Sequence, residues 1–138
     1  MTLRCNTIGL EVIHSPNPVK AQEGGASGYK FTWTYTTTVR ANNDTVVIIN
    51  FGSFFWNGNK WVLDNFTGKP FSAKDFTDWY SCPHATLVIG QECSDTANWT
   101  GGNSLNDGES KWVYVSINSK GEYMKGESII KTSGEIIK

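Results

Sequence analysis

The strict alternation of residues 29–40 constrains the fold more than any other feature of the chain. Lysine, arginine and threonine side chains occupy one face of this segment. The other face carries its large apolar residues: Phe31, Trp33, Tyr35 and Val39. Successive side chains of a β-strand point to opposite faces of a sheet, so a period of two predicts a half-buried strand. The segment therefore predicts a twisted, antiparallel sheet rich in aromatic residues.

The same kind of pattern predicts further strands at four places: residues 3–14, 45–56, 85–90 and 111–118. Between them, Asn57-Gly58 predicts a tight hairpin, because both residue types accept positive φ angles. This hairpin would place Trp56 near Trp61 on the neighbouring strand.

One segment favours a helix. Ser72 and Asp75 have the spacing of a capping box, in which each side chain accepts a hydrogen bond from the other residue's backbone N–H. A single helical turn through Trp79 is therefore expected. Many short strands with regular turns are typical of an antiparallel β-sandwich, with a small β-barrel as the alternative. We expect one all-β domain over residues 1–138, with at most one or two short helical turns.

Two segments lack a clear strand pattern of their own. Residues 93–110 are the most polar stretch and are predicted to form the longest loop. The tail carries isoleucine pairs at 129–130 and 136–137, separated by Thr132, Ser133 and Gly134. Its β-branched residues and the Ser-Gly break favour a hairpin over a helix.

Composition excludes some classes of partner. The chain has 138 residues, a formal net charge of -1 and 18% charged residues. The lack of a basic patch disfavours nucleic acid as a partner, and the longest apolar run, residues 46–49, is too short for a membrane span. No signal peptide is recognisable, so a cytoplasmic protein and a secreted protein whose leader has been removed both stay open. The oligomeric state is not indicated.

Tryptophans outside the strongest alternating strands are the best candidates for a binding site. Trp99 lies in the predicted polar loop, and Trp56 and Trp61 flank the hairpin tip. Exposed tryptophan rings are flat, rigid and amphipathic, which suits sugar rings and similar ligands. The alternative is that these rings cap the open ends of the fold. Hydrogen bonds to a ligand are expected from four neighbours: Asn98, Asn103, Asn106 and Asp107.

Cys82, His84 and Cys93 carry the other chemistry worth weighing. Their spacing lacks the paired ligands of a zinc site, so a disulfide or buried thiols are favoured over a metal. A nucleophile–base pair of Cys82 and His84, oriented by Asp78, lacks an adjoining oxyanion motif. We expect Cys82 and Cys93 to lie near each other, which leaves a bridge between them open, with Cys5 unpaired.

Two loops fall short of metal or phosphate sites. The carboxylates near residues 92–109 lack the alternating spacing of a calcium loop. The glycines of residues 24–28 lack the lysine of a phosphate loop and precede a strand. No metal and no cofactor are therefore predicted.

These observations favour a non-enzymatic, lectin-like module that binds a carbohydrate or another small polar ligand on aromatic platforms. The length and aromatic content resemble those of small β-sandwich lectins and sandwich toxins in composition alone. Two alternatives belong to other classes. One is a protein–protein interaction or immunity-type sandwich, and the other is a small hydrolase or lyase built on Cys82, His84 and Asp78.

Overall fold

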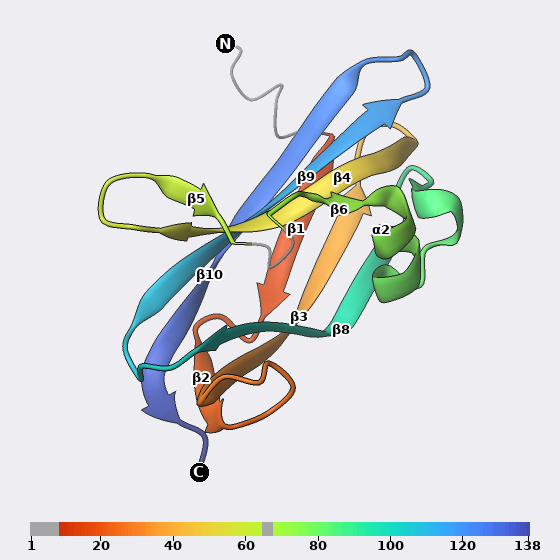
Figure 1. The fold of residues 1–138 in the computed structure, drawn as a ribbon. Helices are drawn as coiled ribbons and strands as arrows, with labels where there is room; N and C mark the ends of the chain where they lie inside the picture. The colour runs from red at the N-terminus through yellow and green to blue at the C-terminus, as the bar shows by residue number, and fades with distance from the viewer. Residues whose placement is uncertain (1–8, 65–67) are drawn as a thin grey trace.

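The computed structural model describes residues 9–64 and 68–138 and is an all-β fold with one short α-helix, as predicted (Figure 1). The strands are β1 (Leu10–Ser15), β2 (Val19–Glu23), β3 (Phe31–Ala41), β4 (Val46–Trp56), β5 (Trp61–Leu63), β6 (Phe71–Ser72), β7 (Thr86–Leu87), β8 (Glu92–Gly102), β9 (Gly108–Asn118) and β10 (Tyr123–Ile136). The helical elements are α2 (Ala73–Tyr80) and the 3-10 turn η1 (Pro83–Ala85). Neither element in the described part of the chain has the length and apolar character needed to cross a bilayer.

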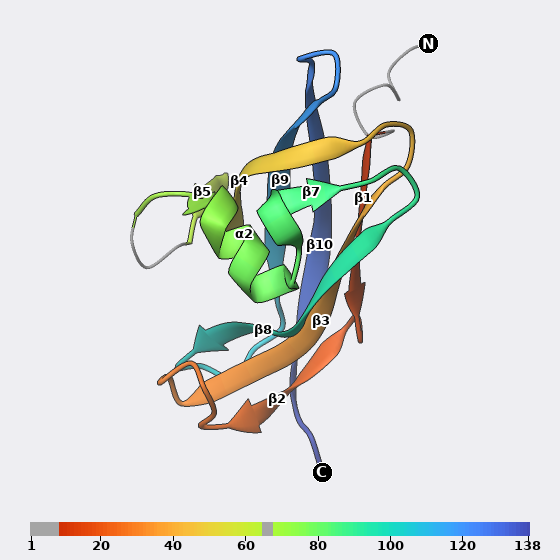
Figure 2. The same ribbon diagram turned by 90° about the vertical axis from the view of Figure 1, so that its right-hand side faces the viewer.

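All ten strands belong to one mixed sheet. Its long antiparallel ladders are β8 with β3, β9 with β10, and β4 with β9. β1 and β2 both pair with β3 along the edge opposite β8. β2 then pairs in parallel with β10. β8 and β4 thus stand near opposite ends of the strand order, yet both contact α2. The sheet must therefore curve, and Figure 2 shows α2 between β4 and β8 on the concave side.

Three strand predictions are confirmed. β3 follows the predicted alternation, with Trp33, Tyr35 and Val39 buried. β9 covers the predicted residues 111–118 and buries Trp112 and Tyr114. The hairpin around Asn57-Gly58 joins β4 to β5, and it holds the Trp56 and Trp61 ring centroids 5.4 Å apart.

Other predictions are wrong. Residues 92–102 form β8 rather than the start of a long loop, because they pair with β3 along most of its length. The tail is no hairpin, since β10 runs on to Ile136 with β9 as its partner up to Thr132 and β2 beyond. The parallel pairing of β2 with β10 makes the sheet mixed rather than purely antiparallel.

One further strand is shorter in the structure than predicted, since within residues 85–90 only Thr86–Leu87 is strand. The first strand is predicted over residues 3–14; β1 covers Leu10–Ser15, and residues 3–8 lie outside the described residues. The choice between a sandwich and a barrel stays a prediction.

The helix α2 begins at the predicted capping box. The Ser72 side chain accepts from the Asp75 backbone N–H at 3.2 Å, and the Asp75 carboxylate accepts from the Ser72 N–H at 3.0 Å. α2 buries Phe76 and Tyr80. Both rings contact Phe51 of β4, at 5.7 and 5.8 Å between centroids, so the helix is anchored to the sheet by an aromatic cluster.

Replacing the cap tests this anchoring. Ser72→Ala removes the side-chain acceptor for the Asp75 N–H, so the free energy of unfolding should fall by about 1 kcal/mol, measured by urea denaturation. Ser104→Ala, at an exposed position between β8 and β9, is the matched control and should leave stability unchanged. Equal stability of the two variants would contradict a structural role for the cap.

Candidate functional site

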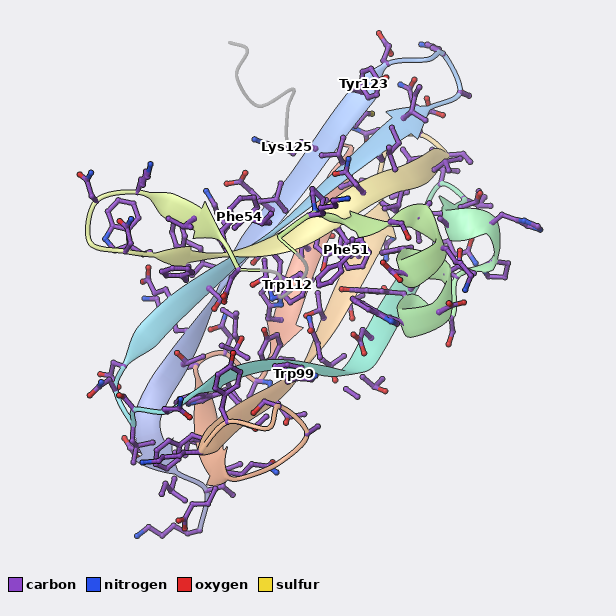
Figure 3. All side chains as sticks on the ribbon, viewed as in Figure 1. Phe51, Phe54, Trp99, Trp112, Tyr123 and Lys125 are labelled. Carbon is purple, nitrogen blue, oxygen red and sulfur yellow. The ribbon has the colours of Figure 1, made fainter. Side chains whose placement is uncertain are left out.

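A pocket of about 600 Å³ opens on the concave side of the sheet. β8 forms one wall, and β4, β5, β6 and α2 contribute to the other, with Trp112 of β9 between them. Figure 3 shows Trp112 and Phe51 in the space between β4 and β8, and Trp99 on β8. Pockets that hold small ligands in proteins measure roughly 300–1,000 Å³, so this one is large enough for a single small molecule.

Trp112 is the buried ring of the pocket and is held by a hydrogen-bond chain. Its Nε1–H donates to the Tyr35 hydroxyl at 2.9 Å, and that hydroxyl lies 2.8 Å from the Thr100 Oγ1. Burial raises the pKa of Tyr35 to about 12, so the phenol stays protonated, and its hydroxyl group shares a hydrogen bond with Thr100. The Thr100 hydroxyl group can also meet a ligand, because Thr100 lines the pocket.

A second chain fixes Asn98. The His14 Nε2 lies 3.3 Å from the carbonyl oxygen of Ser128, so this nitrogen carries the hydrogen. The His14 Nδ1 therefore accepts from the Thr37 hydroxyl at 2.8 Å, and the Thr37 Oγ1 accepts from the Asn98 Nδ2 at 2.9 Å. The Asn98 Oδ1 accepts from the Trp99 N–H at 2.9 Å. The amide is thus oriented before any ligand arrives.

A bulge in β8 explains why so many of its polar side chains reach the pocket. Asn98 lies opposite Tyr35 and Asp95 lies opposite Thr37, so β8 has one more residue than β3 between these pairs. Because of this extra residue, the alternation of inward-facing and outward-facing side chains along β8 shifts by one position at the bulge. Asp95 before the bulge and Asn98 and Thr100 after it therefore face inward together with their buried partners on β3.

Aromatic rings of different exposure surround these polar groups. Trp79 of α2 packs against Phe71 at 4.6 Å and against Phe51 at 5.5 Å between centroids. Tyr29 lies over Gly101, where a side-chain carbon would clash with its ring. Trp112 is only 4% exposed, whereas Trp79, Trp99 and Tyr29 are 39%, 37% and 48% exposed. The pocket thus has a buried aromatic base and aromatic side chains open to solvent.

Two carboxylates line the same pocket. Asp64 follows β5 and Asp95 belongs to β8, and burial raises the pKa of both. Asp95 accepts from the Ala97 N–H at 3.0 Å. None of the ion pairs among the described residues involves Asp64 or Asp95. Among the described residues that line the pocket there is no lysine, arginine or histidine.

The site residues predicted from the sequence lie in different parts of the fold. Asn98 and Trp99 line the pocket. Trp56 and Trp61 contact each other on the β4–β5 hairpin, outside the lining. Asn103 accepts from the Lys30 N–H at 3.0 Å, which is a structural contact.

Asn106 and Asp107 lie at the tail rather than at the pocket. Asp107 accepts from the Gly134 N–H at 2.7 Å, and Asn106 packs against the same glycine. The other lining residues are not among the predicted site residues; those with aromatic or polar side chains include Tyr29, Ser53, Asp64, Trp79, Asp95, Thr100 and Trp112. The aromatic ones could have been found as tryptophans and tyrosines near turns, whereas Asp64 and Asp95 carry no spacing that marks them.

The geometry gives no support to a Cys82 nucleophile. Cys82 is fully buried, its thiol donates to the Thr86 carbonyl oxygen at 3.3 Å, and burial raises its pKa. His84 is exposed on the 3-10 turn. Cys93 lies beside Cys82 as expected, and both are free thiols. No group of three or more histidine, cysteine or acidic side chains in the described part of the chain is arranged to hold a metal ion.

Alkylation tests the state of the two buried thiols. Because the thiolate is the reactive form and burial raises the pKa of Cys82, N-ethylmaleimide should leave Cys82 and Cys93 unmodified in the folded protein. Both should react after unfolding in denaturant without reductant, as read by peptide mass spectrometry. If the two become reactive only after a reductant is added, they form a disulfide and the assignment as free thiols is wrong.

The buried histidine predicts a pH dependence of stability. Burial lowers the pKa of His14 to about 4, below its ordinary 6.5, so between these values the unfolded chain binds a proton that the folded chain does not. Stability is therefore complete above pH 6.5 and is lost as the pH falls toward 4, by up to about 3 kcal/mol. The difference in unfolding free energy between the wild type and His14→Gln should grow by that amount from pH 4 to pH 6.5. Parallel curves for the two proteins would refute it.

Comparison with known proteins does not assign a family. No protein-family model matches the sequence, and no curated protein matches it. Any function must therefore be argued from the pocket itself.

Proposed function

We propose that this protein is a non-enzymatic binding module whose concave pocket holds a carbohydrate or a similar small polar ligand. The observation that carries the proposal is that three tryptophan residues and several oriented polar side chains line one pocket of about 600 Å³. A sugar ring has an apolar C–H face and a rim of hydroxyl groups. The first suits an aromatic ring, and the second suits amide, hydroxyl and carboxylate groups.

The polar groups of the pocket are already oriented, which supports tight binding of a small ligand. Asn98 is held through Thr37, and Thr100 through Tyr35. Groups held this way lose little conformational entropy when they bind, so more of the interaction free energy contributes to affinity. Asn98 still has one N–H and one lone pair to offer, and the Thr100 hydroxyl group has hydrogen-bonding capacity beyond its contact with Tyr35.

The hairpin of β4 and β5 supports a second candidate, a protein partner. It projects from the sheet in Figure 1, and its Phe55 and Trp56 are 39% and 48% exposed. Large exposed aromatic residues on a projecting element are typical anchors of protein interfaces. This surface lies outside the pocket lining, so the two candidate functions can be separated by mutation.

Glycan-array screening followed by tryptophan fluorescence titration of each hit tests the first candidate. Trp99→Ala and Trp79→Ala remove partly exposed rings of the pocket, so each should weaken glycan binding by ~10-fold or more. Trp56→Ala is the matched control, since it removes an equally exposed tryptophan from the hairpin, and it should leave the affinity unchanged.

Two outcomes contradict the proposal. The first is that no glycan shifts the fluorescence of the wild type. The second is that Trp56→Ala weakens glycan binding whereas Trp99→Ala and Trp79→Ala do not. The second outcome would move the binding site to the hairpin.

A further inference from the structure

We propose that the ligand of the concave pocket carries a positive charge, in the form of a protonated amine beside a flat apolar face. The inference rests on the proposed function, since it names the charge of the ligand held in that same pocket. Asp64 and Asp95, from opposite walls, supply the negative charge, and the tryptophan rings supply the apolar surface.

The first argument is that the pocket carries two carboxylates and no basic side chain among its described lining residues. The ion pairs of the described chain all lie elsewhere, on Lys20, Arg40, Lys74, Lys111 and Lys125. A ligand ammonium group would supply a counterion.

The second argument is that the two carboxylates act on the same place. Both Asp64 and Asp95 line the one pocket, from the segment after β5 and from β8. Their negative potentials therefore add in the region where a ligand would sit. The chain as a whole has a net charge of only -1, so this potential is a local property of the pocket.

The third argument is that the aromatic rings favour the same kind of ligand. A cation is attracted to the face of a tryptophan ring, and most strongly where water is partly excluded. Trp112 is buried, and Trp79 and Trp99 are partly exposed around it. An ammonium group in the pocket would therefore find both aromatic and carboxylate residues in the lining, and a neutral hydroxyl group would gain less from each.

The fourth argument comes from stability. Burial raises the pKa of both Asp64 and Asp95, so the folded chain disfavours their charged forms at neutral pH. Charged groups that oppose folding are characteristic of binding sites, where stability is traded for function. A cationic ligand would remove this penalty by neutralising the carboxylates.

A matched pair of sugars tests the charge. The disaccharide of glucosamine, which lacks N-acetyl groups, carries ammonium groups at pH 6. N,N'-diacetylchitobiose, which has them, is its neutral analogue of similar shape. Calorimetric titration should show the ammonium sugar binding at least ~10-fold more tightly. Phenethylamine and 2-phenylethanol form a second pair, which distinguishes an amino sugar from an aromatic amine as the source of the charge.

Charge-removing variants locate the effect. Asp64→Asn and Asp95→Asn keep the shape of the side chain, and each should weaken binding of the ammonium probe by roughly fivefold or more, and by a larger factor than it weakens binding of the neutral analogue. Glu11→Gln, an exposed acid on β1, has the same effect on net charge and should change neither affinity. Both pocket variants should also melt at a higher temperature than the wild type, whereas Glu11→Gln should not.

The outcomes separate this inference from the proposed function. Equal binding of the neutral and ammonium sugars overturns the charge inference and leaves the carbohydrate proposal standing. Binding of phenethylamine without either sugar supports the charge inference and overturns the carbohydrate proposal. Failure of all four probes to bind overturns both.

Discussion

The bulge of β8 against β3 is the constraint on which the pocket depends. A regular ladder would keep one phase along β8, so that Asp95 and Asn98 could not both face inward. With the extra residue between the pair Asp95–Thr37 and the pair Asn98–Tyr35, both side chains reach the concave side. The hydrogen bond that Asn98 donates to Thr37 and the one between the Tyr35 and Thr100 hydroxyl groups then hold this arrangement in place.

The aromatic cluster around Phe51 has the complementary role of holding the opposite wall. Phe51 packs face to face with Tyr114 and edge to face with Phe76 and Tyr80 of α2. The Tyr80 and Tyr114 hydroxyl groups also share a hydrogen bond. Because Phe51 also contacts Trp79, the same packing that fixes the helix sets the position of a ring that lines the pocket. The aromatic packing of the core thus extends to the residues that line the pocket.

The sequence predicts the parts of this structure that are governed by local rules. The alternation around Trp33 and Tyr35, the turn at Gly58 and the capping box at Ser72 each depend on neighbouring residues only. β8 is missed because a strand that lines a polar pocket loses the apolar alternation by which strands are recognised, and because its bulge breaks the period. Asn98 and Trp99 are found as candidates through residue type, whereas Asp64 and Asp95 are brought together by the curvature of the sheet, which no local pattern encodes.

The claim that the concave pocket is the binding site can be tested at single residues. The chain has six tryptophans, and each gives its own indole N–H resonance in a two-dimensional NMR spectrum of the 15N-labelled protein. On titration with a glycan or amine that binds, the account predicts shifts of the Trp79, Trp99 and Trp112 resonances, with Trp33, Trp56 and Trp61 unchanged. Shifts confined to Trp56 and Trp61 would place the ligand on the β4–β5 hairpin and contradict the account.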